Sequence, residues 1–266
     1  RGLSQLHIVP MRLTFGARTY LDGLDLSTSD FYRMLRESRE IPTTSAPSPS
    51  SFLEAFRRAA KEAEAALCLT VSSRFSACFN SAMTATEEAN DTLPGFQVSV
   101  LDTETAAGGE GLVAVEAWRT AARGGGLTEA LATARSVIPQ VRLLAMVDTL
   151  HYLWKSGRVP TIAKAGASLL RIKPIFELVQ GDIHTVARPR TRQRAVRKLV
   201  ELMRGRAEPG RLHVTVMHAD AADAAEDLKR RVEAELSCEE LYISEFTPVM
   251  GAHIGPRLLG LAFRSD

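Results

Sequence analysis

Cysteine is scarce in this sequence, whose 266 residues include only Cys68, Cys78 and Cys238. An odd and sparse set of thiols gives no disulfide framework, and free cysteines usually pack as small apolar side chains. Such cysteine usage is typical of a reducing compartment, so we expect a cytoplasmic protein.

Long apolar runs are also absent. No stretch approaches the ~20 apolar residues that a membrane-spanning helix needs, so we expect a soluble protein without a transmembrane segment. The opening segment, Arg1 to Pro10, lacks the apolar core followed by small residues that marks a secretory leader.

Several sequence motifs of nucleotide binding, zinc binding and nucleophilic catalysis are missing. The chain has no P-loop pattern for nucleotide phosphates, no CxxC or HExxH zinc motif and no GxSxG nucleophile elbow. His213 and His218 are five residues apart on and after a predicted strand, so their side chains should point to opposite faces. We therefore expect no metal, no cofactor and no catalytic residue.

Positive charge is concentrated in one part of the chain. Between Lys155 and Arg206 there are thirteen Lys or Arg against three Asp or Glu, although the whole chain carries a formal charge of only +2. Such an excess indicates either a face that meets an anion, a phosphate or an acidic partner, or a solvated helix face. Few aromatic residues interleave the run, and single-stranded nucleic acids need aromatic stacking platforms, so we expect no nucleic-acid binding.

Strands and helices alternate in the first half of the chain. Residues 66–71 and 97–101 are predicted to be buried strands, because each is short and apolar and ends at polar residues. Helices are predicted between and around them, at residues 28–39, 51–64, 76–90, 106–123 and 127–140. This alternation favours a mainly parallel sheet with helical crossovers, in which binding sites lie beyond the carboxyl ends of the strands.

The second half has a different pattern. A strand is predicted at 143–147, just before the boundary; the second half is predicted to contain a hairpin at 173–185, helices at 190–204 and 220–236, and strands at 213–217, 241–246 and 258–263. These elements favour a second domain with a mixed sheet. We therefore expect an α/β fold of two α/β domains, residues 1–148 and 149–266. The position of the boundary between them is set to within about ten residues.

Two hydroxyl-rich loops are candidate binding segments. Thr44 and Ser45 lie in the segment 41–51, whose three prolines exclude a regular helix or a central strand. Ser73 and Ser76 lie where a predicted strand turns into a helix. Hydroxyl groups and free amides at the start of a helix suit an anion such as a carboxylate, although simple N-capping would also explain the serines.

One histidine joins these loops as a candidate. His253 has Gly251 and Gly255 on either side, and glycine lets the backbone approach another group closely. A single histidine without neighbouring ligands is often structural, so this residue stays a candidate for binding rather than for catalysis.

Six segments of the chain, in order, resemble motifs of the DegV family. They are IPTTSAPSP from residue 41, VSSRFSACFNSA from 71, LDTETAA from 101, LHYLWKSGRV from 150, LRIKPI from 170 and GAHIGP from 251. Any one of them is a weak match, but six in the right order over nearly the whole chain are specific.

The resemblance implies that a long-chain fatty acid binds between two α/β domains, with its acyl tail in an apolar tunnel. It implies Thr44 and Ser76 as ligands of the carboxylate, with Ser45, Ser73 and His253 beside them. The fatty acid would be the bound ligand, and no cofactor is implied.

The resemblance also implies a partner. Bacterial family members present the bound acid to a separate ATP-using fatty-acid kinase, which makes an acyl phosphate for phospholipid metabolism. Arg158 and Arg190 would then serve kinase docking or phosphate handling, and a transient contact with a membrane surface is compatible with this role. An enzyme that acts on a lipid or an acyl carboxylate is the alternative interpretation.

The chain departs from the family pattern near the expected site. Ala46 replaces the usual Gln, Ala77 and Cys78 replace Gly-Thr, Ala252 replaces Thr, and Arg257 stands where glycine is usual. We expect these differences to change the contacts around the carboxylate, and the ability of a kinase to use the bound acid, more than they change lipid binding.

Overall fold

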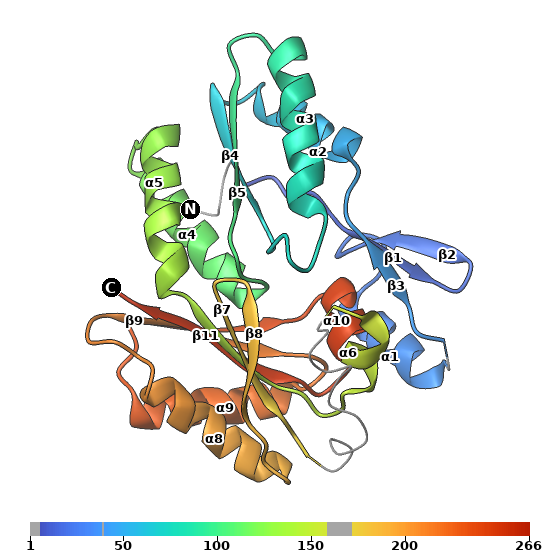
Figure 1. The fold of residues 1–266 in the computed structure, drawn as a ribbon, viewed down its shortest axis with the longest axis vertical. Coiled ribbons are helices and arrows are strands. Elements are labelled where there is room, and N and C mark those ends of the chain that lie inside the picture. Colours follow the sequence, from blue (N-terminus) through green and yellow to red (C-terminus); the bar gives the residue numbers. More distant parts are fainter. Residues whose placement is uncertain (1–5, 39, 159–171) are drawn as a thin grey trace.

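The computed structural model describes residues 6–38, 40–158 and 172–266. They form an α/β fold with a three-stranded sheet, a two-stranded parallel sheet and a six-stranded sheet. The parallel pair and its helices lie above the six-stranded sheet in Figure 1, and the small sheet lies to one side.

The small sheet is antiparallel. It consists of β1 (Arg12–Phe15), β2 (Arg18–Leu21) and β3 (Thr43–Ser45), with β1 in the middle. Gly16, whose φ is 61°, lies in the turn between β1 and β2, where a left-handed conformation favours glycine. The sequence did not predict this hairpin. It predicted segment 41–51 as a loop, and three residues of that loop form an edge strand, a position that neighbouring prolines permit.

The parallel pair separates two groups of helices. It consists of β4 (Ala65–Thr70) and β5 (Gln97–Asp102), with α2 (Pro49–Ala59), α3 (Cys78–Thr92), α4 (Gly108–Ala122) and α5 (Leu127–Val137) around it. Leu67 and Leu69 of β4 pack into the core that includes α4 and α5, whereas Ala66 and Cys68 pack against α2 and α3. Alternate side chains of a strand point to opposite faces, so these strands contribute side chains to two separate cores. This arrangement agrees with the predicted parallel sheet with helices on its faces.

The six-stranded sheet is mixed. Its strands are β6 (Arg142–Met146), β7 (Ile175–Val179), β8 (Asp182–Ala187), β9 (Leu212–His218), β10 (Glu240–Glu245) and β11 (Leu259–Ser265). Their order is β10-β9-β11-β6-β7-β8, with β9 and β10 parallel and the other neighbours antiparallel. The helices α8 (Arg192–Arg204) and α9 (Ala222–Glu235) cover one face over an apolar core, and α4 contacts β9 and β11. The predicted mixed sheet is confirmed.

The chain changes sheets shortly before β6. A 3₁₀ turn, η1 (Ile138–Gln140), follows α5 and leads directly into β6, which pairs with β7 and β11. The strand predicted at residues 143–147 therefore belongs to the six-stranded sheet. The predicted domain boundary at residue 148 lies just after this strand and would assign it to the first domain.

Three helices fill the space between the small sheet and the six-stranded sheet. They are α1 (Thr28–Glu37), α6 (His151–Ser156) and α10 (Pro248–Ile254). α10 contacts α1, α6, β1 and β3, so a segment near the end of the chain packs against segments near its beginning. The sequence predicted α1 but neither α6 nor α10, both of which are too short to show a clear helical period.

Most predicted helix bounds agree with the structure to within a few residues. The main exception is α2, which begins at Pro49 with Ser48 as its N-cap and ends at Ala59, whereas the prediction ran from 51 to 64. Proline suits the first turn of a helix because its missing N–H would be unpaired there. None of the helices among residues 6–38, 40–158 and 172–266 combines the length and the apolarity needed to cross a bilayer.

Gly251 permits the close packing of α10 against α1. A Cβ added to Gly251 would lie 2.5 Å from Cε1 of Phe31 and 2.7 Å from the hydroxyl oxygen of Tyr32, whereas a Cβ on Gly111 in α4 would meet nothing within 4 Å. We expect Gly251→Ala to destabilise the protein by about 1–3 kcal/mol through overpacking. The matched variant Gly111→Ala should stabilise it by about 0.5–1 kcal/mol through helix propensity.

Urea unfolding of both variants measures these changes. If Gly251→Ala were as stable as the original protein, α10 would not be held against α1 in the way described.

Candidate functional site

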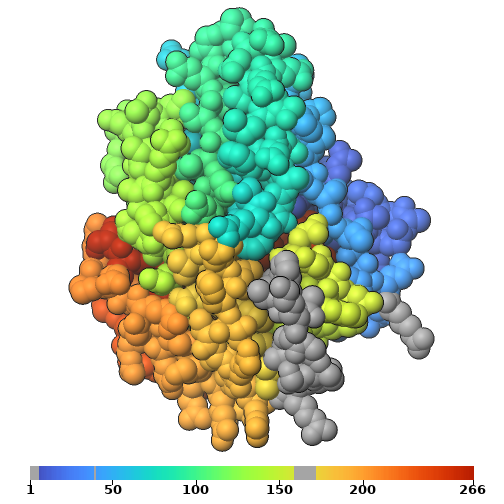
Figure 2. Space-filling model, in the orientation of Figure 1, coloured from blue at the N-terminus to red at the C-terminus, as the bar shows by residue number. Residues whose placement is uncertain are grey.

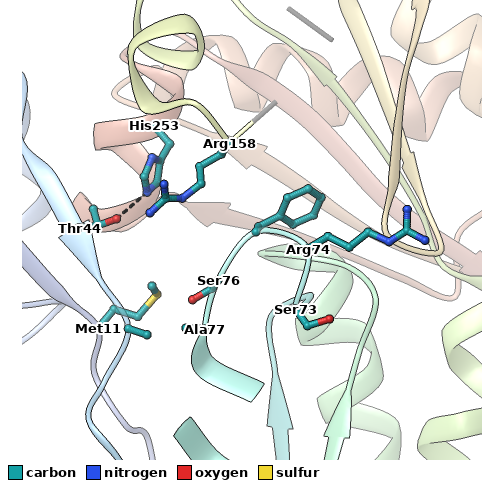
Figure 3. Close-up of a pocket in the computed structure, with 10 residues that line it drawn as sticks. Met11, Thr44, Ser73, Arg74, Ser76, Ala77, Arg158 and His253 are labelled. Atoms are coloured by element: carbon teal, nitrogen blue, oxygen red, sulfur yellow. Dashed lines mark hydrogen bonds between the residues drawn. The ribbon is translucent and has the colours of Figure 1, made fainter. Parts of the chain in front are cut away.

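A pocket of about 330 Å³ lies where the small sheet, the loop after β4, α6 and α10 meet. Ten residues line it: Met11, Thr44, Ala46, Ser73, Arg74, Phe75, Ser76, Ala77, Arg158 and His253. Figure 3 shows how these side chains are drawn together from distant parts of the chain.

A hydrogen bond joins two of these residues that are 209 positions apart in the sequence. Oγ1 of Thr44 in β3 lies 2.8 Å from Nε2 of His253 in α10. The α10 backbone is fixed in turn by Asp22, whose Oδ1 accepts a 3.0 Å hydrogen bond from the amide of Val249. β3 and α10 therefore present their polar side chains to the pocket as one unit.

The imidazole of His253 is held in its neutral form. Burial lowers its pKa to about 4, and the positive charge of Arg158 adds to the effect. Figure 3 shows the Arg158 guanidinium beside His253 and Thr44. At neutral pH, the permanent positive charge at this place is that of Arg158, while His253 offers one donor and one acceptor.

Ser76 lies at the entrance to α3. Its Oγ accepts a 3.3 Å hydrogen bond from the amide of Cys78, the first residue of the helix, and donates to the Cys78 sulfur at 3.1 Å. The hydroxyl therefore satisfies the first free amide of the helix, although Ala77 is the N-cap residue and the helix has no side-chain capping hydrogen bond. It also lines the pocket, beside a helix N-terminus that carries partial positive charge.

The loop after β4 is fixed by its neighbours. Asp102 accepts hydrogen bonds from the amides of Ser73, at 3.1 Å, and Glu104, at 2.8 Å. Arg74 forms an ion pair with Asp182 at the tip of the β7–β8 hairpin. The hairpin thus touches the loop from the side of the six-stranded sheet, a contact visible where yellow meets teal in Figure 2.

The polar part of the pocket favours an anion. No Asp or Glu stands among its ten lining residues, which include Arg158 and Arg74. Figure 3 shows that Arg74 extends away from Thr44 toward the hairpin, so of these two arginines Arg158 lies nearer to the hydroxyl groups of Thr44 and Ser76. A carboxylate placed among Thr44, Ser76 and Arg158 would find donors and a compensating charge.

The opposite part of the pocket is apolar. Met11 and Ala46 line it and also pack against the core between α2, α3 and the parallel pair. Several side chains of this core that belong to the strands are only partly buried, namely Ala66, Cys68, Val98 and Val100. The pocket therefore borders an apolar layer that is not tightly closed at the sheet.

Five of the predicted site residues meet in this pocket: Thr44, Ser73, Ser76, Arg158 and His253. Ser45 does not line it, because successive residues of a strand point to opposite faces and Ser45 is exposed beside Thr44. Arg190 is exposed and is not a lining residue either.

The sequence did not predict the roles of Met11, Arg74 and Phe75. Arg74 and Phe75 lie inside the serine motif and could have been included with it, whereas no local signal marks Met11. Within the described part of the chain, no group of three or more His, Cys, Asp or Glu side chains is arranged to hold a metal ion.

Comparison with known families gives a match over nearly the whole chain. The model of the DegV family, described as a family of uncharacterised proteins, matches residues 2–266. The chain belongs to the DegV family, and the resemblance found in its sequence motifs is confirmed.

Relatives share both the sequence and the fold. A DegV domain-containing protein of Streptomyces coelicolor is 33% identical over 259 residues, which cover 97% of this chain and 90% of that protein. A fatty-acid-binding DegV family protein from Thermus thermophilus superimposes with a TM-score of 0.89 at 28% identity, over 97% of this chain and 91% of its own. DegV of Bacillus subtilis, a fatty acid binding protein, superimposes with a TM-score of 0.87 at 26% identity, over 98% and 92%.

The low pKa of His253 predicts how stability depends on pH. Because burial keeps the folded-state pKa near 4 and the ordinary value is 6.5, the unfolded chain binds more protons in this range, and stability should fall as pH drops from about 6.5 to 4. The contribution of this residue should be at most about 3 kcal/mol. His253→Gln removes it, so urea unfolding at pH 7.5 and pH 5 should show a smaller loss for the variant than for the original protein. Equal losses in both proteins would contradict the assignment of His253 as a buried neutral imidazole.

Proposed function

We propose that this protein binds a long-chain fatty acid and does not itself transform it. The observation that carries the proposal is the pocket, in which hydroxyl groups, a neutral histidine and an arginine meet beside an apolar layer. Related DegV family structures that bind fatty acids have the same fold, with TM-scores of 0.89 and 0.87.

The polar end of the pocket would receive the carboxylate. Thr44 and Ser76 would donate hydrogen bonds to it, His253 would orient the Thr44 hydroxyl, and Ser73 and Ser45 would lie nearby. The charge of Arg158 would offset the negative charge of the carboxylate, so that the head group is not left unpaired when it leaves water.

The acyl tail would enter the apolar layer past Met11 and Ala46. Each buried CH₂ contributes about 0.8 kcal/mol, so a tail of ~15 such groups would contribute roughly 12 kcal/mol before the costs of association. The tail therefore supplies most of the affinity, and the head-group contacts mainly fix its orientation.

An enzyme acting on a lipid or an acyl carboxylate is a second candidate, favoured by one observation. The 2.8 Å contact between Thr44 and His253 has the geometry of a hydroxyl and its general base. However, a pKa near 4 makes this imidazole a weak base at neutral pH, which supports the carrier function. Turnover of a fatty acyl ester by the purified protein alone would favour the enzyme.

The bound carboxylate would be presented to a separate ATP-using kinase in the cytoplasm, for conversion to an acyl phosphate. Arg158 and Arg190 would meet the phosphates or the partner, and the concentration of positive charge between Lys155 and Arg206 supports this role. A transient contact with a membrane surface would let the fatty acid be exchanged.

The double variant Thr44→Ala, Ser76→Ala tests the head-group assignment. Loss of two hydrogen bonds to a charged group should weaken fatty-acid binding by roughly 10- to 1,000-fold. Isothermal titration with oleate measures this change, with Ser136→Ala, an exposed hydroxyl on α5, as the matched control. Circular dichroism establishes that the variants are folded. Unchanged affinity in the double variant would rule out these two residues as carboxylate ligands.

Mass spectrometry of an organic extract tests the function itself. Protein purified from bacteria should release about one fatty acid per chain, and the identity of that acid gives the preferred tail. A folded sample that carries no lipid and takes up none in titration would contradict the proposal.

A further inference from the structure

The short helix α10 is attached at both of its ends to the part of the chain that forms the small sheet. At its C-terminal end, Nε2 of His253 lies 2.8 Å from Oγ1 of Thr44 in β3. At its N-terminal end, Oδ1 of Asp22 accepts a 3.0 Å hydrogen bond from the amide of Val249, the second residue of the helix. Between these attachments, Gly251 packs against α1. A displacement at one end of α10 would therefore be transmitted along the helix to the other end.

Asp22 is itself fixed by the small sheet. It directly follows β2, and its amide donates a 2.9 Å hydrogen bond to the carbonyl oxygen of Met11, which precedes β1 and lines the pocket. Leu13 in β1 is paired with Thr44 in β3. The contacts thus form a closed ring, which runs from β1 through Asp22 and α10 to His253 and returns through Thr44 to β1.

The start of α10 depends on an acceptor from outside the helix. The first amides of a helix have no partner within it, and Thr247, the N-cap residue, makes no side-chain capping hydrogen bond. Pro248 at the first position has no N–H group, so Val249 carries the first amide that needs an acceptor. The carboxylate of Asp22 supplies this acceptor. A helix of seven residues is too short to be stable without such contacts.

The Asp22 carboxylate depends on the helix in return. Burial raises the pKa of Asp22, and hydrogen bonds from Thr247 and Val249 act in the opposite direction. A carboxylate that is partly removed from water needs such donors, because an unpaired buried charge is costly. Asp22 and the first turn of α10 therefore hold each other in place.

We propose that Asp22 is a positioning residue for the carboxylate-binding site, and that it acts through α10 to hold His253 where the imidazole orients the Thr44 hydroxyl. This inference rests on the proposed function. Asp22 is not among the lining residues of the pocket, so its effect on a ligand passes through the helix and not through direct contact. Without the acceptor at its start, α10 would turn about its packing at Gly251, and His253 would move relative to Thr44.

Titration of oleate into variants of Asp22 tests the proposal. Asp22→Ala removes the acceptor and should weaken oleate binding by roughly three- to tenfold, whereas Asp22→Asn keeps an acceptor oxygen and should restore the original affinity. The matched control is Asp25→Ala, which removes an exposed carboxylate that accepts from the amide of Leu21 in the same turn, and it should bind oleate like the original protein. In a His253→Ala background, Asp22→Ala should cause no further loss of affinity.

An NMR measurement without ligand separates this inference from the proposed function. The imidazole nitrogen resonances of His253, identified by their absence from the spectrum of His253→Gln, report on the hydrogen bond to Thr44 in the free protein. They should shift in Asp22→Ala and keep their positions in Asp22→Asn and Asp25→Ala. If the original protein binds no oleate but these shifts are observed, the proposed function fails and the positioning of His253 by Asp22 is supported.

Unshifted His253 resonances in folded Asp22→Ala would overturn the proposal, as would an equal loss of affinity from Asp22→Ala with and without the imidazole. A purely structural role would give that result, because a general loss of stability does not depend on His253. Thermal unfolding verifies that each variant is folded. If Asp22→Ala is not, Asp22→Glu takes its place: it keeps the carboxylate but extends it by one CH₂, and it should shift the same resonances and weaken oleate binding.

Discussion

The hydrogen bond between Thr44 and His253 joins segments that are 209 residues apart, and the arrangement of the pocket depends on it. Thr44 lies on an edge strand with only β1 beside it, so the sheet alone does not fix the direction of its hydroxyl. α10 supplies that direction, because Gly251 allows the helix to approach Phe31 and Tyr32 and thereby brings His253 to β3. A polar contact at the pocket is therefore held in place by apolar packing behind it.

The loop that carries Ser76 is held by a different set of contacts. Asp102 binds two backbone amides of neighbouring loops, and the ion pair between Arg74 and Asp182 ties the loop to the β7–β8 hairpin. The two halves of the pocket are thus fixed to different sheets. Relative movement of these sheets would change the distance between Thr44 and Ser76, so any ligand that contacted both residues would stabilise one arrangement of the sheets.

The sequence predicted much of this site because its polar residues fall in motifs. Thr44, Ser76 and His253 were each identified from hydroxyl clusters, flanking glycines and the DegV resemblance, and all three line the pocket. Ser45 was included because it is next to Thr44 in sequence, but the alternation of a strand places it outside. That distinction required knowing that residues 43–45 form an edge strand, which a segment rich in proline does not reveal.

The fold was predictable to a similar extent. Periodicity and apolar runs predicted the parallel pair and the mixed sheet, because these features depend on local patterns. α10 was not predicted, since two glycines within Gly251–Gly255 suggest a loop, and its helical form depends on packing against α1 and α6. Likewise, the sheet order β10-β9-β11-β6-β7-β8 pairs β11 with β6, strands more than a hundred residues apart, for which no local pattern exists.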